Sequence, residues 1–167
     1  LGFTTPSFDR ETLPVAKEGT FEYNLNQLQA LANSFLGVQE QRAPVYSAKQ
    51  IDGKRAYEFA RKEEQVEIKL HRIEVFEFEL SELQGNRVNF KIRCSKGTYI
   101  RSLANDFGER GGFGAYLWSL RRTQSLPFRV EDALTPKAWV EHFFPTYSSV
   151  NEHFSDDSVK KVFTKAF

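Results

Sequence analysis

The chain has 167 residues, and its 23 lysines and arginines nearly balance its 22 aspartates and glutamates, which gives a formal net charge of +1. This balance excludes a domain that is basic throughout, the simplest signature of a nucleic-acid-binding protein, while an apolar fraction of 40% is enough for one sizeable core. A single cysteine, Cys94, excludes an intrachain disulfide and a cysteine-rich zinc cluster, and three scattered histidines argue against a metal site.

The first part of the chain predicts a loop followed by one helix. Residues 1–23 form a strand end and a loop in this prediction, because prolines and a glycine interrupt regular structure. A helix follows, with Asn24 or Asn26 as its cap and Gly37 as its end. Its apolar stripe, at helical spacing, consists of Leu28, Leu31, Ala32 and Phe35.

The middle of the chain predicts several strands and one short helix. The chain is expected to be extended around Pro44, because proline disfavours helix in the residue before it, and to form a helix over about 54–62. Apolar residues among charges predict two strands, over about 66–70 and 75–80. A Gly-Asn turn then leads into another alternating strand, over 88–95.

The remainder predicts two helices, a strand and a tail that is helical in part. The first helix ends at Gly108 or at the glycine pair 111–112, a second short helix covers about 114–120, and a strand lies around 124–130. Strands interspersed with helices, without strict alternation, predict an α+β fold with a mixed sheet and flanking helices. The apolar face of the first of these helices consists of Ile100, Leu103, Ala104 and Phe107.

The sequence carries no signal for a membrane or for export. No window approaches the ~18 consecutive apolar residues of a membrane span. The first residues, LGFTTPSFDRET, lack the basic and then apolar layout of a secretory signal. A cytoplasmic protein is therefore expected. The chain also opens at Leu1 and contains no methionine, so we expect that a front part is missing.

The near-zero net charge conceals a basic middle. Residues 87–129 hold nine bases and two acids, a local charge of +7, and residues 42–72 hold eight bases and five acids, a local charge of +3. The rest of the chain carries −9. A basic middle between acidic ends can form a patch for a polyanion, although mixed charges on exposed helices and strands explain the same counts.

Arg101 is the sharpest candidate for chemistry. It lies in the first turn of its predicted helix, where the helix dipole disfavours a cation, and off the apolar face. A fixed anionic partner, either a protein carboxylate or a phosphate, explains this position, and an ordinary surface arginine is the alternative.

Other groups in the basic segments suit either RNA or plain structure. The glycines of KGT (96–98) and GGFG (111–114) match no mononucleotide-binding motif, and capping or turning helices is the simpler explanation. Arg121 and Arg122 can meet phosphates or merely favour a helix C-terminus. Three tyrosines among bases suit stacking on unpaired nucleotides or core packing: Tyr46, Tyr57 and Tyr99.

Three blocks of the sequence resemble one family, the TruB family of pseudouridine synthases. CSKGTYIRSLANDFGERGGFGAYLWSLRRTQSLPF is similar to its C-S-K-G-T-Y-I-R-x-L-x-x-D-x-G block and to the G-A-x-L-x-x-L-R-R-T that follows. QRAPVYSAKQIDGKRAYEFAR resembles its Q-x-P-P-x-Y-S-A-x-K segment, and LGFTTPSFDRET resembles its L-G-x-x-T-x-T-x-D segment. The blocks occur in family order and cover most of residues 1–130.

The resemblance implies the pseudouridine synthase fold and an activity. Members isomerise a T-loop uridine of tRNA (position 55 type): they flip the base, detach it at N1, rotate it and reattach it through C5, without metal or organic cofactor. The family's catalytic aspartate lies in a G-x-L-D-P-x-A motif and its stacking tyrosine in a K-x-Y motif. Neither motif occurs in this sequence. Both belong upstream of LGFTTPSFD, so the chain is expected to lack the nucleophile and to be inactive alone.

The resemblance also assigns site residues. Arg101 matches the arginine that pairs with the catalytic aspartate, and Asp9 matches an aspartate that helps to organise this arginine. Tyr99 and Leu120 match positions that line the uracil pocket. Phosphate contacts are expected from Lys96, Arg121 and Arg122. A thumb segment at about 42–72, which clasps the T-arm in the family, supplies Tyr46, Lys54, Arg55, Tyr57 and Arg61.

The match has two departures and leaves one stretch unassigned. Ala43 replaces the first proline of P-P, and Lys49 stands one residue earlier than the family's lysine, so Lys49 is not given that lysine's role. Residues 1–135 are expected to be a partial catalytic domain, and the tail 136–167 is too short for the RNA-binding PUA domain of some relatives. The expected partner is tRNA, bound by a monomer. A non-catalytic RNA-binding protein of the same fold is the alternative, and a guide-RNA-dependent relative is a third reading that the thumb segment disfavours.

Overall fold

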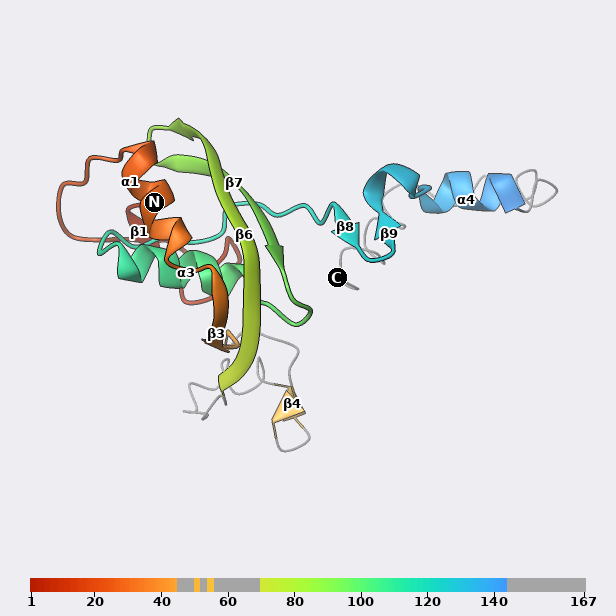
Figure 1. Ribbon diagram of the computed structural model, residues 1–167, viewed down its shortest axis with the longest axis horizontal. Coiled ribbons are helices and arrows are strands. Elements are labelled where there is room, and N and C mark those ends of the chain that lie inside the picture. The colour runs from red at the N-terminus through yellow and green to blue at the C-terminus, as the bar shows by residue number, and fades with distance from the viewer. Residues whose placement is uncertain (45–49, 52–53, 56–69, 144–167) are drawn as a thin grey trace. The chain divides into compact units, whose positions relative to one another are not determined.

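The computed structural model describes residues 1–44, 50–51, 54–55 and 70–143 (Figure 1). The chain forms two compact units, Leu1–Leu120 and Arg121–Phe167. In the part of the chain that the structure describes, no helix is long and apolar enough to cross a membrane.

The first unit is built on a three-stranded antiparallel sheet of order β3-β6-β7. The strands are β3 (Gly37–Arg42), β6 (Leu70–Gln84) and β7 (Arg87–Cys94). A turn at residues 85–86 joins β6 to β7, and Gly85 has the positive φ of +58° that such a tight turn requires. The hairpin predicted around the Gly-Asn turn is confirmed.

In the long strand β6, the residues that face the core do not keep one regular two-residue alternation. Ile73, Val75 and Phe78 are buried, whereas Phe76 is 43% exposed. The pairing register with β7 shifts between Val75 and Glu77, as at a β-bulge. Phe76 faces outward in the ordinary two-residue alternation, and the one extra residue of the bulge makes Phe78, rather than Glu77, the next residue to face the core.

Both predicted helices are present, and local signals mark the start of the first and the end of the second. Helix α1 (Leu25–Asn33) starts at Asn24, whose Oδ1 accepts hydrogen bonds from the backbone N–H groups of Asn26 at 2.9 Å and Gln27 at 3.3 Å. This confirms Asn24 as the cap, but the helix ends before Gly37, which instead opens β3 at φ +92°. Helix α3 (Ile100–Arg110) is followed by Gly111, as predicted.

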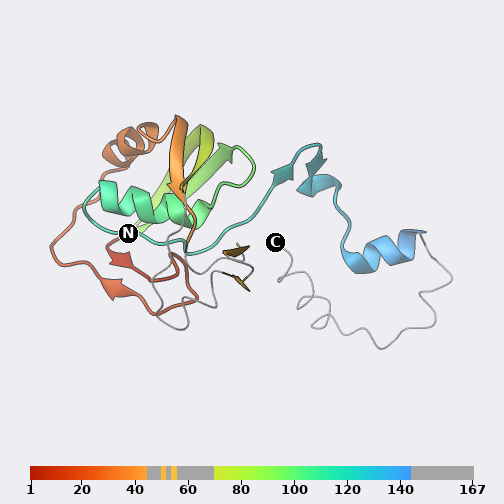
Figure 2. The ribbon, with the colours of Figure 1, turned by 90° about the horizontal axis from the view of Figure 1, so that it is seen from below.

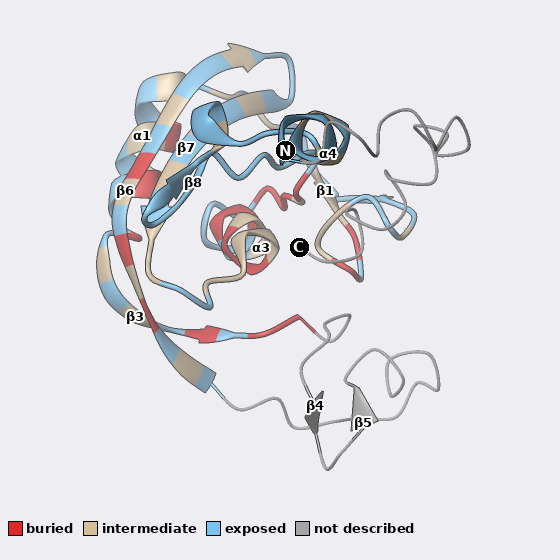
Figure 3. Cartoon of the chain, turned by 90° about the vertical axis from the view of Figure 1, so that its right-hand side faces the viewer, coloured by how far each residue is buried: buried red, intermediate tan, exposed pale blue. Residues whose placement is uncertain are grey.

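The core lies where both helices meet β6. The Phe35 ring, which follows α1, lies 6.1 Å from the Phe78 ring of β6 and 6.2 Å from the Phe107 ring of α3. Phe78 and Phe107 are themselves 5.7 Å apart, so α1 and α3 pack on the same face of the sheet (Figure 2). Figure 3 shows the buried residues along β6 and on α3. Burying three phenylalanines together supplies about 5–9 kcal/mol of apolar transfer free energy.

The predicted helix over 114–120 is wrong. This segment has no helical turn, because its backbone groups bind distant partners. Gly114 takes φ +71°, donates to the Gly108 carbonyl and accepts from the Gly2 N–H, while the Leu117 N–H donates to the Phe8 carbonyl at 2.8 Å. The 114–120 segment therefore lies against the N-terminal segment, where β1 (Phe3–Thr4) pairs with β2 (Val15–Ala16).

Two further expectations are corrected in detail. The strand predicted around 124–130 is a short hairpin of β8 (Gln124–Ser125) and β9 (Phe128–Arg129), with a cis peptide bond before Pro127. A helix does not begin at position 54, because β5 (Lys54–Arg55) is a strand that pairs with β4 (Gln50–Ile51). The rest of the predicted 54–62 helix lies outside the described residues, as does the first predicted strand up to residue 69.

The second unit continues from β9 into short helical segments. A 3-10 turn at Val130–Asp132 precedes helix α4 (Pro136–Phe143), which agrees with a partly helical tail. The α+β class is confirmed. Every ladder among the described strands is antiparallel, so the parallel pair of a mixed sheet is not among them.

Candidate functional site

Arg101 and Asp9 form an ion pair across 92 residues of sequence. Arg101 Nη1 donates to Asp9 Oδ2 at 2.8 Å, and the two side chains are 19% and 20% exposed. A charge-assisted hydrogen bond of this length in such a sheltered place contributes about 1.5–3 kcal/mol. Asp9 supplies an anionic partner of the kind that the position of Arg101 in the first turn of α3 predicts.

The loop that carries Asp9 is held by its own hydroxyl groups. The Thr5 hydroxyl donates to the Asp9 carbonyl at 2.8 Å, and the buried Ser7 hydroxyl lies 2.8 Å from that of Thr12. The second carboxylate oxygen of Asp9 accepts from the Glu11 N–H at 3.0 Å. One oxygen of Asp9 is thus fixed by its own loop, and the other is presented to Arg101.

The start of α3 is fixed by a glutamine from β3. Gln41, which is 2% exposed, donates from Nε2 to the Tyr99 carbonyl at 3.0 Å and accepts from the Tyr99 N–H at its Oε1, at 2.8 Å. One turn further, the Ser102 hydroxyl donates to the Arg42 carbonyl at 3.1 Å. The Tyr99 side chain makes no capping hydrogen bond. Gln41, on a neighbouring strand, instead satisfies the backbone groups of Tyr99.

The turn before α3 is supported from β6. His71 Nε2 donates to the Gly97 carbonyl at 3.2 Å, and Gly97 has φ +81°, which favours glycine. The His71 ring meets the Tyr99 ring edge to face, with 5.9 Å between centroids. Gln41 of β3 and His71 of β6 are paired opposite each other. Gln41 therefore positions the backbone of Tyr99, and His71 positions its ring.

The other predicted site residues are placed as follows. Lys96 is exposed in the turn before α3, and Leu120 is 56% exposed at the end of the first unit. Arg121 and Arg122 are exposed and belong to the second unit. The backbones of Lys54 and Arg55 lie in β5. Outside the described residues lie Tyr46, Tyr57 and Arg61. The structure thus joins Asp9 directly to Arg101 in the first turn of α3, and Tyr99 is the residue just before that helix.

Sequence reasoning missed the residues that support the site. Gln41 occupies the glutamine of the Q-x-P-P segment and stands at the inward position of β3, where an apolar residue is usual. A polar side chain at a buried strand position was the available signal. His71 and Ser102 gave no comparable signal, because their partners are backbone carbonyls of distant segments.

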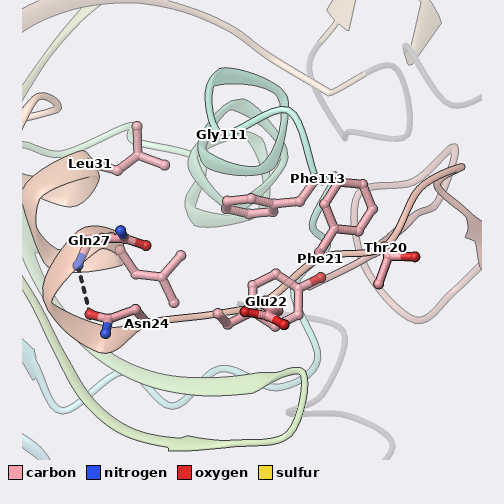
Figure 4. Close-up of a pocket in the computed structure, with 10 residues that line it drawn as sticks. Thr20, Phe21, Glu22, Asn24, Gln27, Leu31, Gly111 and Phe113 are labelled. Carbon is pink, nitrogen blue, oxygen red and sulfur yellow. Dashed lines mark hydrogen bonds between the residues drawn. The ribbon is translucent and has the colours of Figure 1, made fainter.

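A cavity of about 350 Å³ lies elsewhere in the first unit (Figure 4). It is lined by residues 20–24, by one side of α1 and by Gly111 and Phe113, and Figure 4 shows the Phe113 ring beside Phe21. None of the predicted site residues lines it. The geometry around Arg101, rather than this cavity, identifies the candidate site.

Comparisons with known proteins agree with the resemblance. A family model described as TruB family pseudouridylate synthase (N terminal domain) matches residues 1–100. The tRNA pseudouridine synthase B of Chloroherpeton thalassium is 40% identical over 147 residues, which are 87% of this chain and 61% of that protein. The tRNA pseudouridine synthase B of Phocaeicola vulgatus is 43% identical over 141 residues, 84% of this chain and 60% of that protein. The chain thus spans about 60% of the length of these two relatives.

The fold has a counterpart among solved structures. A chain of a crystal structure of a Cbf5-Nop10-Gar1 complex superposes with a TM-score of 0.59 and 28% identity, covering 80% of this chain and 36% of that one. This likeness confirms the pseudouridine synthase fold expected from the sequence. Since the family model matches well over half of the residues, and the curated relatives match most of them, the chain belongs to the TruB family of pseudouridine synthases.

Proposed function

We propose that this chain is the greater part of a tRNA pseudouridine synthase that isomerises a T-loop uridine to pseudouridine. The observation that carries the proposal is the Asp9–Arg101 ion pair at the start of α3, within the segments that match the family's motifs. The proposal includes the T-arm of tRNA as the substrate, a monomeric enzyme, and the cytoplasm as its location.

The geometry supports a division of roles. Arg101 is held by Asp9 at 2.8 Å, so its guanidinium has a fixed position from which to orient a second carboxylate, the nucleophile of the upstream G-x-L-D-P-x-A motif. Tyr99, fixed at both backbone groups, offers a ring of fixed position beside a flipped base. Lys96 is an exposed cation in the turn before this ring, suited to a neighbouring phosphate.

The test joins this chain to an upstream segment that carries the G-x-L-D-P-x-A and K-x-Y motifs. The joined protein is expected to release tritium from [5-³H]uridine in a T-arm stem-loop, because C5 exchanges its hydrogen for the glycosidic bond. The chain alone is expected to release none. If the joined protein binds the RNA but forms no pseudouridine, it is a non-catalytic RNA-binding protein. If it is active only with an added guide RNA, it is a guide-dependent enzyme.

Arg101→Ala in the joined protein tests the role of the ion pair. We expect kcat to fall by at least about a hundredfold, because the catalytic carboxylate loses its orientation, while RNA affinity changes by less than about threefold. The matched control is Arg110→Ala at the other end of α3, where the guanidinium bonds to Ser34 instead. A loss of affinity as large as the loss of kcat would make Arg101 a phosphate contact and refute this role.

A further inference from the structure

Two arginines share one exposed indole next to the candidate site. The guanidinium carbon of Arg10 lies 4.3 Å from the ring centre of Trp118, and that of Arg87 lies 4.0 Å from it. Trp118 is 43% exposed, and both arginines are exposed. We call this group the Arg10–Trp118–Arg87 cluster. It includes none of the residues that the motifs predict for the site.

Three segments far apart in the sequence build the cluster. Arg10 follows Asp9 in the N-terminal loop, Arg87 opens β7, and Trp118 lies in the irregular segment 114–120. A backbone hydrogen bond of 2.8 Å, from the Leu117 N–H to the Phe8 carbonyl, ties the segment of Trp118 to the loop of Arg10. The indole is therefore placed by the backbone as well as by the two arginines, and this makes it a fixed platform.

The cluster concentrates positive charge that carboxylates do not neutralise. Within residues 1–44 and 70–143, neither Arg10 nor Arg87 lies within 4.0 Å of a carboxylate, whereas Lys17, Lys91, Arg93, Arg101 and Lys137 all do. The two guanidinium carbons are at most 8.3 Å apart, because they lie 4.3 Å and 4.0 Å from the same ring centre. An anion that reaches the edges of both groups is attracted by two positive charges at once.

The chemistry of the cluster fits a phosphodiester backbone. Guanidinium forks bind phosphate oxygens bidentately, and an arginine stacked on an aromatic ring keeps its N–H edges free for this purpose. Arginines interleaved with aromatic rings are typical of RNA contacts.

We propose that the Arg10–Trp118–Arg87 cluster binds the phosphate backbone of the RNA substrate close to the base that reaches Arg101. The closeness follows from the chain itself, because Asp9 contacts Arg101 and the next residue, Arg10, contacts Trp118. Consecutive Cα atoms are about 3.8 Å apart, so the cluster and the candidate site are neighbours. The proposal rests on the proposed function, which supplies the RNA.

The test measures binding of a T-arm stem-loop RNA to the chain by fluorescence anisotropy over a range of salt concentrations. The double variant Arg10→Gln/Arg87→Gln is expected to bind about tenfold more weakly or worse near 0.1 M salt, and to lower the slope of log K against log salt by about 2. Arg110→Gln is the matched control, because Arg110 also stacks on a ring, Phe35 at 3.8 Å, but bonds to Ser34. It should leave both values unchanged.

Tryptophan fluorescence provides an independent readout, because the chain has two tryptophans. RNA should change the emission of the parent chain and of Trp139→Phe, and this change should disappear in Trp118→Phe. Circular dichroism of every variant checks that it folds. An unfolded double variant is replaced by Arg10→Lys/Arg87→Lys, which keeps the salt slope but should still weaken binding through loss of the guanidinium forks.

The outcomes separate this inference from the proposed function. The folded double variant could keep the affinity and the salt slope of the parent chain, with no emission change from Trp118. This result would mean that the cluster only packs the surface, and it would overturn this inference but not the proposed function. Failure of the parent chain to bind the stem-loop at all would overturn the inference, and the same failure in the joined protein would also overturn the RNA substrate.

Discussion

Removal of the Gln41 side chain should weaken the start of α3 by an amount that the hydrogen bonds predict. In Gln41→Ala, the Tyr99 N–H loses its acceptor at 2.8 Å and the Tyr99 carbonyl loses one of its two donors. The other donor, the Leu103 N–H at 3.1 Å, is the helical bond and remains. The perturbation therefore leaves one backbone N–H without a partner and one carbonyl with half of its bonds.

The two losses have different sizes. A buried N–H without an acceptor costs about 1–3 kcal/mol, and a neutral hydrogen bond whose acceptor keeps another partner is worth about 1 kcal/mol. Since Gln41 is 2% exposed, water does not readily replace it. The sum, about 2–4 kcal/mol, is a large part of the about 5–15 kcal/mol that stabilises a typical domain.

Urea unfolding followed by circular dichroism measures this loss. With an m-value of about 2 kcal/mol/M, the midpoint should fall by about 1–2 M. Gln39→Ala is the matched control on the same strand, because Gln39 makes a single bond, to the Phe35 carbonyl at 2.6 Å, and should lose only about 1 kcal/mol. Gln41→Met fills the volume without the hydrogen bonds. A Met variant as stable as the parent would refute the reasoning, because packing would then explain the whole effect.

Three further predictions concern packing, pH and RNA. Gly108→Ala should lower the melting temperature, corresponding to about 1–3 kcal/mol or more, because a Cβ there would lie 2.0 Å from the backbone nitrogen of Ala115; stabilisation, as alanine's helix propensity alone predicts, would contradict this packing. The hydrogen bond from Lys91 holds the pKa of Glu77 below its ordinary value of 4.5, so its stabilisation is present above that pH and is lost as the pH falls through the lowered pKa. Lys91→Met should therefore flatten the acid side of a plot of urea midpoint against pH, and an unchanged plot would show that the pair contributes nothing. Changing the Arg121-Arg122 pair to glutamine should weaken T-arm binding and lower the salt slope by about 2, whereas an unchanged slope would exclude phosphate contacts.

The sequence predicted the elements whose signals are local. Helix α1 follows from an asparagine cap and an apolar stripe, α3 from apolar spacing closed by glycine, and the β6–β7 hairpin from a Gly-Asn turn between alternating strands. Each signal lies within one turn or one strand pair, so no distant contact is needed to read it. The dipole argument left Arg101 either with an anionic partner or as an ordinary surface arginine, and the resemblance was needed to suggest Asp9.

The largest failure has a physical cause, which is that distant backbone partners override local preference. Residues 114–120 have helical composition, but Gly114 and Leu117 bond to segments more than a hundred residues away. The failure at Lys54–Arg55 is local instead, because a tight hairpin pairs these residues with β4, two residues earlier. Gln41 serves Tyr99, 58 residues further on. No periodicity within a short window records such partners, so the supports of the site became visible only in three dimensions.

The positions of these supports connect the two halves of the proposed function. The segment that the resemblance assigns to the thumb leaves β3 after Arg42 and returns at Leu70, and these two residues are paired opposite each other. The next pair inward is Gln41 and His71, which hold Tyr99 and the Gly97 turn. Under the proposed function, the thumb segment is therefore anchored to the sheet one residue from the side chains that support Tyr99. A substitution at Gln41 or His71 is then expected to weaken RNA binding and turnover together.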